Sequence, residues 1–240
     1  MHTPFRVRKL DSPALEDLSS GSLPELRDIE LVLAKAFTGD IFTAVVTGHN
    51  PKDPATAHIG PFWKSTVVAG LLGGEVYVAE TDDAERRIIG CAVWFGPGHT
   101  MYDTEAQQKY SLGPLMASFS EELQQWWHSQ FLPRYDSFVA SALGEGAKHN
   151  SWHLQTLGVD PLYQRRGAAG LLINVIVEKA RSTGAMFCVE AETETNVEVY
   201  TKLGFQVMPK GKNGIHNCSD TFTGVTGDSF PMWVLMREAN

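Results

Sequence analysis

Leu157-Gly-Val-Asp-Pro-Leu-Tyr-Gln-Arg-Arg-Gly-Ala-Ala-Gly-Leu-Leu172 is the stretch of this 240-residue sequence around which the fold is built. It is typical of the end of an apolar strand, a tight turn at Asp160-Pro161, and the glycine-rich start of a helix. Unpaired backbone N–H groups and the positive end of the helix dipole converge at such a start, and Arg165 and Arg166 add two guanidinium groups. The stretch therefore predicts a binding site for an anion.

The flanking segments predict a chain in which strands and helices alternate, as judged from the spacing of apolar residues. Strands are expected at residues 5–10, 75–80, 87–95, 152–159, 185–191, 205–208 and 232–237. Helices are expected at residues 24–37, 57–72, 164–183 and 195–203, with a loop or broken helix at 38–54 and a long loop at 211–228. This order predicts an α/β fold with a mixed sheet.

Residues 98–150 interrupt this order between the third and fourth expected strands. The part from Met101 to about Arg134 has apolar residues at helical spacing, so we expect one amphipathic helix that covers an apolar surface. Residues 144–150 are polar and predict a linker.

The composition limits the classes of function. A net charge of −8 argues against a nucleic-acid partner, because a basic face is needed to displace counterions from phosphates. No apolar run reaches the ~18 residues of a membrane span, and the N-terminus lacks a signal-peptide core, so we expect a cytoplasmic protein without a membrane partner. The three cysteines (Cys91, Cys188 and Cys218) show no metal-ligand spacing, which predicts reduced thiols and no metal.

Two common phosphate-binding loops do not fit the stretch after residue 163. A Walker A loop needs a Lys-Ser/Thr pair, and a dinucleotide loop needs Gly-x-Gly-x-x-Gly after the first strand. The stretch instead resembles the acyl-coenzyme A loop of the GNAT acetyltransferase superfamily, Gln/Arg-x-x-Gly-x-Gly/Ala, which Gln164, Gly167 and Ala169 fill. Tyr200-Thr-Lys-Leu-Gly-Phe205 is similar to the Tyr-x-x-x-Gly-Phe ending of many members.

This resemblance implies a mixed, mostly antiparallel central sheet flanked by helices. It implies that residues 1–240 form a single domain with a helical insertion at about 98–150, and that the strand at 152–159 splays from the one at 185–191. It further implies acetyl-coenzyme A as the co-substrate, without a metal. The residues expected against the cofactor are Leu157, Gly158, Val159, Gln164, Arg165, Arg166, Gly167, Ala168, Ala169, Gly170, Asn196 and Tyr200.

The resemblance also supplies candidate catalytic residues. Tyr200 is the candidate general acid, because a phenol can protonate the departing thiolate. His153 is the candidate base: residues 153–159 resemble the His-x-His-x-Leu-Ala-Val strand of arylalkylamine N-acetyltransferases, with Gln155 in place of the second histidine. Because strands alternate their faces, we expect His153, Gln155 and Leu157 to point the same way, with Gln155 towards the acceptor.

Alternatives remain open for the base and for the acceptor. Glu190 and Glu192 share a face at the end of a strand, and either could be the base, bind a cationic acceptor or face solvent. Trp94 and Phe95 are candidate contacts for an apolar acceptor. The sequence thus predicts an enzyme, an N-acetyltransferase that acts on a small-molecule amine as a monomer or homodimer. The alternative is a non-catalytic acyl-coenzyme A sensor or interaction module.

Overall fold

A computed structural model describes residues 4–20, 23–49, 59–181, 184–209 and 219–238. Its strands are β1 (Phe5–Lys9), β2 (Glu75–Thr81), β3 (Ile88–Phe95), β4 (Trp152–Val159), β5 (Phe187–Ala191), β6 (Gln206–Val207), β7 (Ser219–Thr223) and β8 (Ser229–Arg237). They form one sheet in the order β1-β2-β3-β4-β5-β8-β6, with β7 paired to β8. Only β4 and β5 pair in parallel, so the expected mixed, mostly antiparallel sheet is confirmed.

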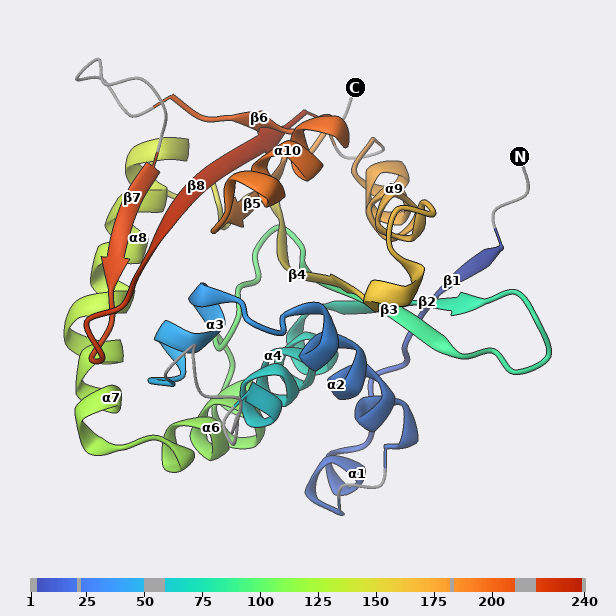
Figure 1. Ribbon diagram of the computed structural model, residues 1–240, viewed down its shortest axis with the longest axis horizontal. Coiled ribbons are helices and arrows are strands. Elements are labelled where there is room, and N and C mark those ends of the chain that lie inside the picture. Colours follow the sequence, from blue (N-terminus) through green and yellow to red (C-terminus); the bar gives the residue numbers. More distant parts are fainter. Residues whose placement is uncertain (1–3, 21–22, 50–58, 182–183, 210–218, 239–240) are drawn as a thin grey trace.

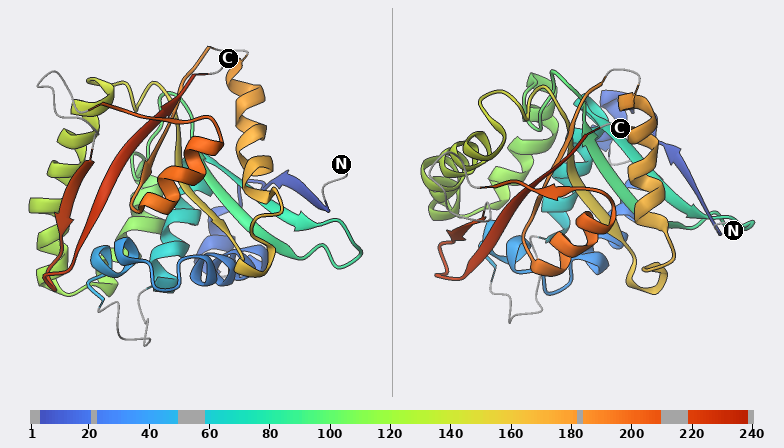
Figure 2. Two further views of the ribbon diagram at one scale, coloured as in Figure 1. Left: turned by 45° about the horizontal axis from the view of Figure 1, so that its top comes forward. Right: turned by 90° about the horizontal axis from the view of Figure 1, so that it is seen from above.

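Helices cover both faces of the sheet (Figures 1 and 2). One face carries α9 (Ala168–Arg181) and α10 (Glu194–Lys202), over a core that includes Ile89, Leu172 and Phe205. The other face carries α2 (Pro24–Ala36), α3 (Ile41–Val46) and α4 (Ile59–Gly73), over a core that includes Leu33, Val67 and Phe230. A short helix, α1 (Leu15–Ser20), precedes α2.

Gly158 sets how closely α2 approaches the sheet. A Cβ atom at this position would stand 2.6 Å from Cδ2 of Leu33, so only glycine lets α2 lie directly on β4. This close packing places the segment that follows α2, which holds Phe37 and Asp40, beside the carboxyl end of β4.

The insertion between β3 and β4 is helical as expected, but it is not one helix. It consists of α5 (Glu105–Gln107), a π-helical turn (Gln108–Leu112), α6 (Gly113–Ser118), α7 (Glu121–Trp126), a second π-helical turn (Trp127–Phe131) and α8 (Leu132–Leu143). Phe119 is extended and breaks the run, and Ser120 begins α7 by accepting a hydrogen bond from the Leu123 amide. The indoles of Trp126 and Trp127 then donate to the carbonyls of Thr223 and Val46, which ties the insertion to β7 and α3.

Other elements depart from the sequence expectations. Residues 219–223 of the expected loop form β7, because they pair with the first half of β8; residues 210–218 lie outside the described part. The helix expected from residue 164 begins only at Ala168. A 3-10 turn at Pro161–Tyr163 comes first, and Arg165 and Gly167 then take positive φ angles of 59° and 95°. The broken helix expected in 38–54 is α3, and α1 was not expected.

Candidate active site

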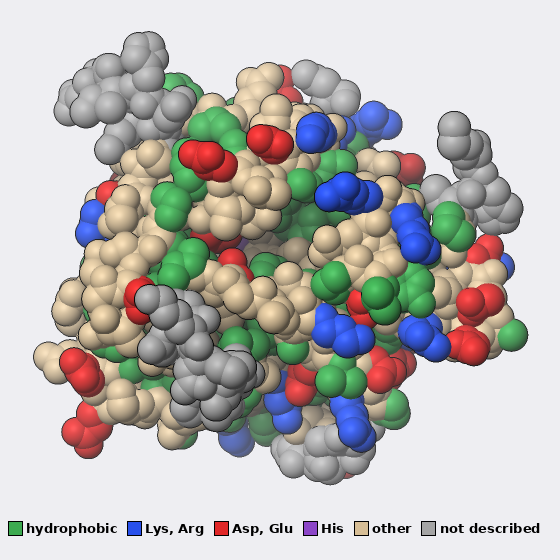
Figure 3. All heavy atoms as spheres, viewed as in Figure 1, with side chains coloured by type: hydrophobic (Ala, Val, Ile, Leu, Met, Phe, Trp, Pro, Cys, Tyr) green, Lys and Arg blue, Asp and Glu red, His purple; other side chains and the backbone are tan. Residues whose placement is uncertain are grey.

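The candidate active site is a cavity of about 1150 Å³ that opens where β4 and β5 separate. The two strands pair only over Trp152–Leu154 and Phe187–Val189, after which β4 continues to Val159 paired with β3 on one edge and without β5 on the other. Residues 154–159 and 189–190 line the opening, so the expected splay is present. Figure 3 shows a hollow near the centre of this face, with Lys and Arg side chains on the side towards α9.

The glycine-rich loop forms one end of the cavity. The Leu171 amide bonds to the Gly167 carbonyl, so the four preceding amides lie in the unpaired first turn of α9, a 14-residue helix. A Cβ atom on Gly167 would meet nothing within 4 Å, which leaves these amides approachable. Gly167, Ala168, Ala169 and Gly170 all line the cavity, and open amides at a helix N-terminus fit a pyrophosphate.

The polar side chains before the glycine separate into two groups. Gln164 and Arg165 line the cavity, and Gln164 Nε2 donates to the Val159 carbonyl at 3.0 Å. Arg166 lies over the Tyr163 ring, 5.7 Å from its centroid, and lines a separate hollow beside Phe5. The structure therefore brings Arg165 to the cavity and does not bring Arg166 there.

A bulge in β4 changes which side chains share a face. Val93 pairs with Thr156 and Trp94 pairs with Leu154, which leaves Gln155 as an extra residue between them. Strand alternation is interrupted at such a residue. His153 thus shares its face with Thr156, and the expectation that His153, Gln155 and Leu157 point the same way is wrong. Gln155, Leu157, Gly158 and Val159 still line the cavity, whereas His153 does not.

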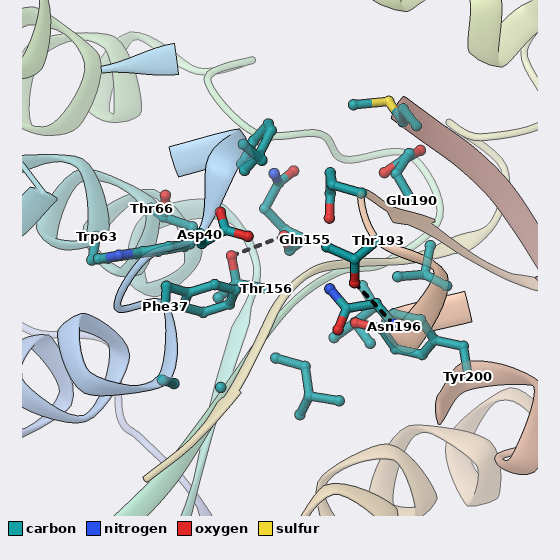
Figure 4. Close-up of a pocket in the computed structure, with 18 of the residues that line it drawn as sticks. Phe37, Asp40, Trp63, Thr66, Gln155, Thr156, Glu190, Thr193, Asn196 and Tyr200 are labelled. Carbon is teal, nitrogen blue, oxygen red and sulfur yellow. Dashed lines mark hydrogen bonds between the residues drawn. The ribbon is translucent and has the colours of Figure 1, made fainter. Parts of the chain in front are cut away.

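His153 lies next to Glu190 and does not line the cavity. Its side chain is only 2% exposed, and Nε2 lies 2.6 Å from Glu190 Oε2. Burial lowers the pKa of His153, and the neighbouring carboxylate opposes this without reversing it. His153 therefore reaches the cavity only through Glu190, which lines it (Figure 4).

The Glu190 carboxylate is ionised at neutral pH. Burial alone would raise its pKa, but His153 and Lys148 outweigh burial and lower the pKa to about 2. Lys148 Nζ stands 3.8 Å from Glu190 Oε1 and also contacts the Tyr135 hydroxyl. A carboxylate with such a low pKa is a weak base near neutral pH.

Tyr200 and Asn196 reach the cavity from α10. Thr193 begins this helix by accepting a hydrogen bond from the Asn196 amide at 3.1 Å, and Tyr200 packs edge-on against Phe205. Both side chains face the cavity beside Thr193 (Figure 4). Burial, with added repulsion from Glu192, raises the pKa of Tyr200, so the phenol keeps its proton at neutral pH. A protonated phenol is suited to be a proton donor.

Trp94 and Phe95 do not reach the cavity. Both are completely buried because helices cover both faces of β3: Trp94 packs against Phe187 on the α9 side, and Phe95 belongs to the core on the α4 side. The structure therefore does not support them as contacts for an acceptor.

Other aromatic side chains line the cavity on the side of α2, α4 and the insertion. Phe37 and Trp63 stack with ring centroids 4.2 Å apart. The further apolar lining residues there are Phe42, Phe62, Met101, Met116, Trp127 and Phe131. Their helical spacing in the sequence indicated only core packing, because spacing cannot show which buried ring faces a cavity.

Asp40 also lines the cavity and was missed by sequence reasoning. Its Oδ2 atom begins α3 by accepting hydrogen bonds from the amide and the hydroxyl of Thr43, each at 2.7 Å. Figure 4 places Asp40 with Phe37, Trp63 and Thr66, across the cavity from Glu190. The Asp-x-x-Thr pattern signals a helix cap and carries no sign of the cavity.

The described part of the chain holds no group of three or more His, Cys, Asp or Glu side chains placed to bind a metal ion. Cys91 and Cys188 are free and buried, and Cys218 lies outside the described residues. Along the described residues, no helix combines the length and apolar character needed to cross a membrane.

A mixed sheet that splays beside a glycine-rich helix start agrees with the family resemblance of the sequence. Residues 50–205 match the sequence model of the acetyltransferase (GNAT) family. This match covers more than half of the chain, so the protein belongs to the GNAT family. No curated protein sequence matches the chain closely enough to count as a relative.

Solved structures with the same fold share little sequence with this chain. A Corynebacterium glutamicum protein described as histone acetyltransferase HPA2 and related acetyltransferase is 17% identical, with a TM-score of 0.54 over 98% of this chain and 96% of its own. The polyamine N-acetyltransferase of Drosophila melanogaster is 16% identical, with a TM-score of 0.54 over 98% and 99%. A mosquito arylalkylamine N-acetyltransferase-like protein, 5b, is 15% identical, with a TM-score of 0.51 over 98% and 99%. At these identities the likeness establishes the fold alone.

Proposed function

We propose that the protein is an N-acetyltransferase that moves an acetyl group from acetyl-coenzyme A directly to a small-molecule amine. One observation carries the proposal: the open amides of α9, the free part of β4 and the Tyr200 side chain all border one continuous cavity. A donor that spans these features has its pyrophosphate at one end and its thioester in front of Tyr200.

The donor would bind mainly through backbone groups. The amides from Gly167 to Gly170 would hold the pyrophosphate, with Arg165 as an added charge partner. The pantetheine arm would pair with β4 near Leu157 and Val159, where β5 no longer occupies that edge. Asn196 would contact the arm from α10.

The transfer needs no covalent enzyme intermediate. The amine nitrogen attacks the thioester carbonyl carbon, the C–N bond forms, and the C–S bond breaks with its electron pair left on sulfur. Tyr200 would protonate that thiolate. A carboxylate of the cavity would take the proton of the amine. His153 does not line the cavity, so it would act as a positioning residue that orients Glu190 through their hydrogen bond.

The acceptor would be a small molecule. The helical insertion closes the cavity on one side with Met101, Met116, Trp127 and Phe131, which suits a compact ligand better than an extended peptide. The Drosophila enzyme of similar fold forms N-acetylagmatine, which is the acetylated form of a small amine. Cytoplasmic location, the single domain and the monomeric or homodimeric state stay predictions.

The loop assignment is tested by calorimetry with acetyl-coenzyme A on the wild type and on Gly167→Glu. A carboxylate on the pyrophosphate site should repel the donor and raise its Kd by at least about 100-fold. Gly98→Glu is the matched control, because Gly98 also has a positive φ, 88°, and an open surrounding, but lies outside the cavity. Equal affinity in the wild type and Gly167→Glu would refute the assignment.

Release of coenzyme A with a panel of primary amines tests the reaction itself. Tight donor binding without release for any amine would contradict the proposed activity and would instead indicate an acyl-coenzyme A sensor. Calorimetry thus tests whether the donor binds, and the release of coenzyme A tests whether the acetyl group is transferred.

A further inference from the structure

An ion pair connects two segments that line opposite parts of the cavity. Lys35 Nζ, in the last turn of α2, donates to Oδ2 of Asp160 at 2.9 Å, although the two residues are 125 positions apart in the sequence. Neither side chain lines the cavity. The chain lines it directly beyond each of them, from Ala36 to Asp40 on one side and at residues 163–165 on the other. The ion pair therefore joins the two segments without being able to touch a ligand.

Asp160 fixes the first turn of the loop that leads to α9. Its Oδ1 atom accepts a hydrogen bond from the Leu162 amide at 3.0 Å, and its carbonyl accepts one from the Tyr163 amide at 2.8 Å. Its own amide donates to the Ile89 carbonyl at 2.8 Å, and its side chain is only 8% exposed. Burial would raise the pKa of Asp160, but the Leu162 amide and Lys35 outweigh burial and lower it. The carboxylate is therefore ionised at neutral pH, and each of its oxygens has a partner.

The loop between this turn and α9 has a backbone conformation that needs support. Arg165 has a φ of 59°, in the left-handed region that residues other than glycine rarely adopt. Such a residue costs free energy and keeps its conformation only where the surrounding contacts hold it. Within the described residues, the bond from Lys35 is the one ion pair that reaches residues 160–167. How firmly the loop is held thus depends on Asp160 and its partner.

The helix that carries Lys35 is a firm support. Ile29 and Leu33 of α2 are completely buried in the core on that face of the sheet. The end of α2 lies directly on β4, where a Cβ atom at Gly158 would stand 3.3 Å from the Cβ atom of Ala36. Because α2 is packed in this way, Lys35 holds Asp160 at a fixed place relative to the sheet.

We propose that Lys35 is a positioning residue for the donor, which acts through Asp160 to hold the glycine-rich loop in the conformation that presents the first amides of α9. The inference rests on the proposed acetyltransferase function and adds a residue of α2 to the donor site. When only the held loop binds the pyrophosphate, the observed Kd equals the intrinsic Kd divided by the fraction of molecules in which the loop is held. Loss of the ion pair lowers that fraction and raises the observed Kd.

A direct effect of charge is the alternative that the experiment must separate. Near an anion site, a lysine lowers the Kd for the donor by attraction, whereas an aspartate raises it by repulsion. Charge alone therefore predicts opposite effects when Lys35 and Asp160 are neutralised. The proposed role predicts the same effect for both changes, because each breaks the same bond.

Calorimetry with acetyl-coenzyme A on a set of variants tests the proposal. Lys35→Met and Asp160→Asn should each raise the Kd by about three- to tenfold, the range expected for a partly buried ion pair that controls a loop. Asparagine can still accept the hydrogen bond from the Leu162 amide, so the turn itself should remain. The double variant should show no larger effect than either single variant. Lys35→Arg keeps a cationic donor and should stay within about twofold of wild type.

Steady-state kinetics with a panel of primary amines supplies a second measurement. In Lys35→Met the KM for acetyl-coenzyme A should rise, while kcat at saturating donor should stay within about threefold of wild type. The reason is that Tyr200, the proposed proton donor, lies on α10 and not on this loop. A general loss of structure would not produce this separation of KM from kcat.

Lys179→Met is the matched control. Lys179 also pairs with a carboxylate of another element, Glu75 on β2, at 2.6 Å. It lies on α9 itself, but in the last turn and outside the cavity. The change removes the same charge and a similar ion pair, so the Kd for acetyl-coenzyme A should stay within about twofold of wild type.

Three results would overturn the inference. An unchanged Kd in Lys35→Met and Asp160→Asn would mean that the ion pair has no influence on the donor. A lower Kd in Asp160→Asn would assign the effect to charge alone, and a double variant in which the two effects add would mean that the residues act separately. A wild type that does not bind acetyl-coenzyme A would overturn the proposed function instead, so the two failures are distinguishable.

Discussion

The two halves of the cavity are built in different ways. The half proposed to bind the donor comes from one run of chain, residues 157–205, and offers mostly backbone groups: the amides before Leu171 and the edge of β4 that β5 leaves open. The half proposed to bind the acceptor comes from segments far apart in the sequence, with Asp40 before α3, Trp63 on α4, Trp127 in the insertion and Glu192 after β5. A donor common to a family can be bound by a local backbone motif, whereas an acceptor is selected by side chains that only the folded chain assembles.

Tyr200→Phe is expected to have the largest effect and tests whether the donor half also carries the chemistry. Loss of the phenol should lower kcat by about 10²–10⁴, because the thiolate leaves unprotonated, while the Kd for acetyl-coenzyme A stays within about threefold. Steady-state kinetics and calorimetry measure the two quantities. Tyr110→Phe, in the insertion and outside the cavity, is the control. A kcat that stays at the wild-type value would show that another donor protonates the sulfur.

Trp127→Phe should produce an intermediate effect confined to the acceptor half. The change removes the donor to the buried Val46 carbonyl, which should cost about 1–3 kcal/mol in the free energy of unfolding. Because Trp127 also lines the cavity, KM for the amine should rise while the Kd for acetyl-coenzyme A is unchanged. Denaturant titration and steady-state kinetics measure these effects.

Trp126→Phe is the matched control for that experiment. Its indole donates to the Thr223 carbonyl at 2.9 Å, but Trp126 does not line the cavity. Because Thr223 is exposed and water can replace the lost donor, Trp126→Phe should lower stability by less than Trp127→Phe, and it should not raise KM. If both variants raise KM equally, the separation of the two halves is incorrect.

The smallest expected effect concerns the buried His153. The pKa of His153 is lower in the folded protein than in the unfolded chain, so below pH 6.5, its ordinary pKa value, the unfolded chain binds more protons. The free energy of unfolding therefore falls as the pH falls below 6.5. His153→Gln has no proton to gain and should therefore lose less stability than the wild type between about pH 7 and about pH 5. Denaturant midpoints over this range measure the slope.

An exposed histidine supplies the control for this pH dependence. In His99→Gln the replaced side chain is 58% exposed, so a slope reduced as much in this variant as in His153→Gln would show that the effect does not depend on the burial of His153. A slope unchanged in His153→Gln would mean that another group causes the acid sensitivity. Glu190 is not that group near neutral pH, because with a pKa of about 2 it loses its contribution only as the pH falls from the ordinary carboxyl value of 4.5 towards 2.

The successes and failures of the sequence expectations follow the same division. The strand and turn from Leu157 to Pro161 and the loop at Gly167 were predicted, because apolar alternation, proline and glycine act on the local backbone. Trp94 and Phe95 failed as acceptor contacts because both faces of β3 are covered, and a strand pattern does not reveal its neighbours. The prediction that His153 and Leu157 share a face was wrong because the bulge at Gln155 arises only from the pairing of β4 with β3.

By itself, the sequence determined the mixed sheet, the helical insertion and the position of the glycine-rich loop, since each depends on local backbone preferences and apolar periodicity. Only the tertiary structure decided which side chains line the other half of the cavity. The sequence identifies Asp40 only as a helix cap. It lines the cavity because Gly158 lets α2 lie close to β4, and Asp40 follows α2. Glu192 faces the same cavity because β5 ends early and splays from β4. Whether two such residues line one cavity depends on contacts between distant segments. The packing of helices on the sheet determines these contacts, and a local sequence pattern does not predict them.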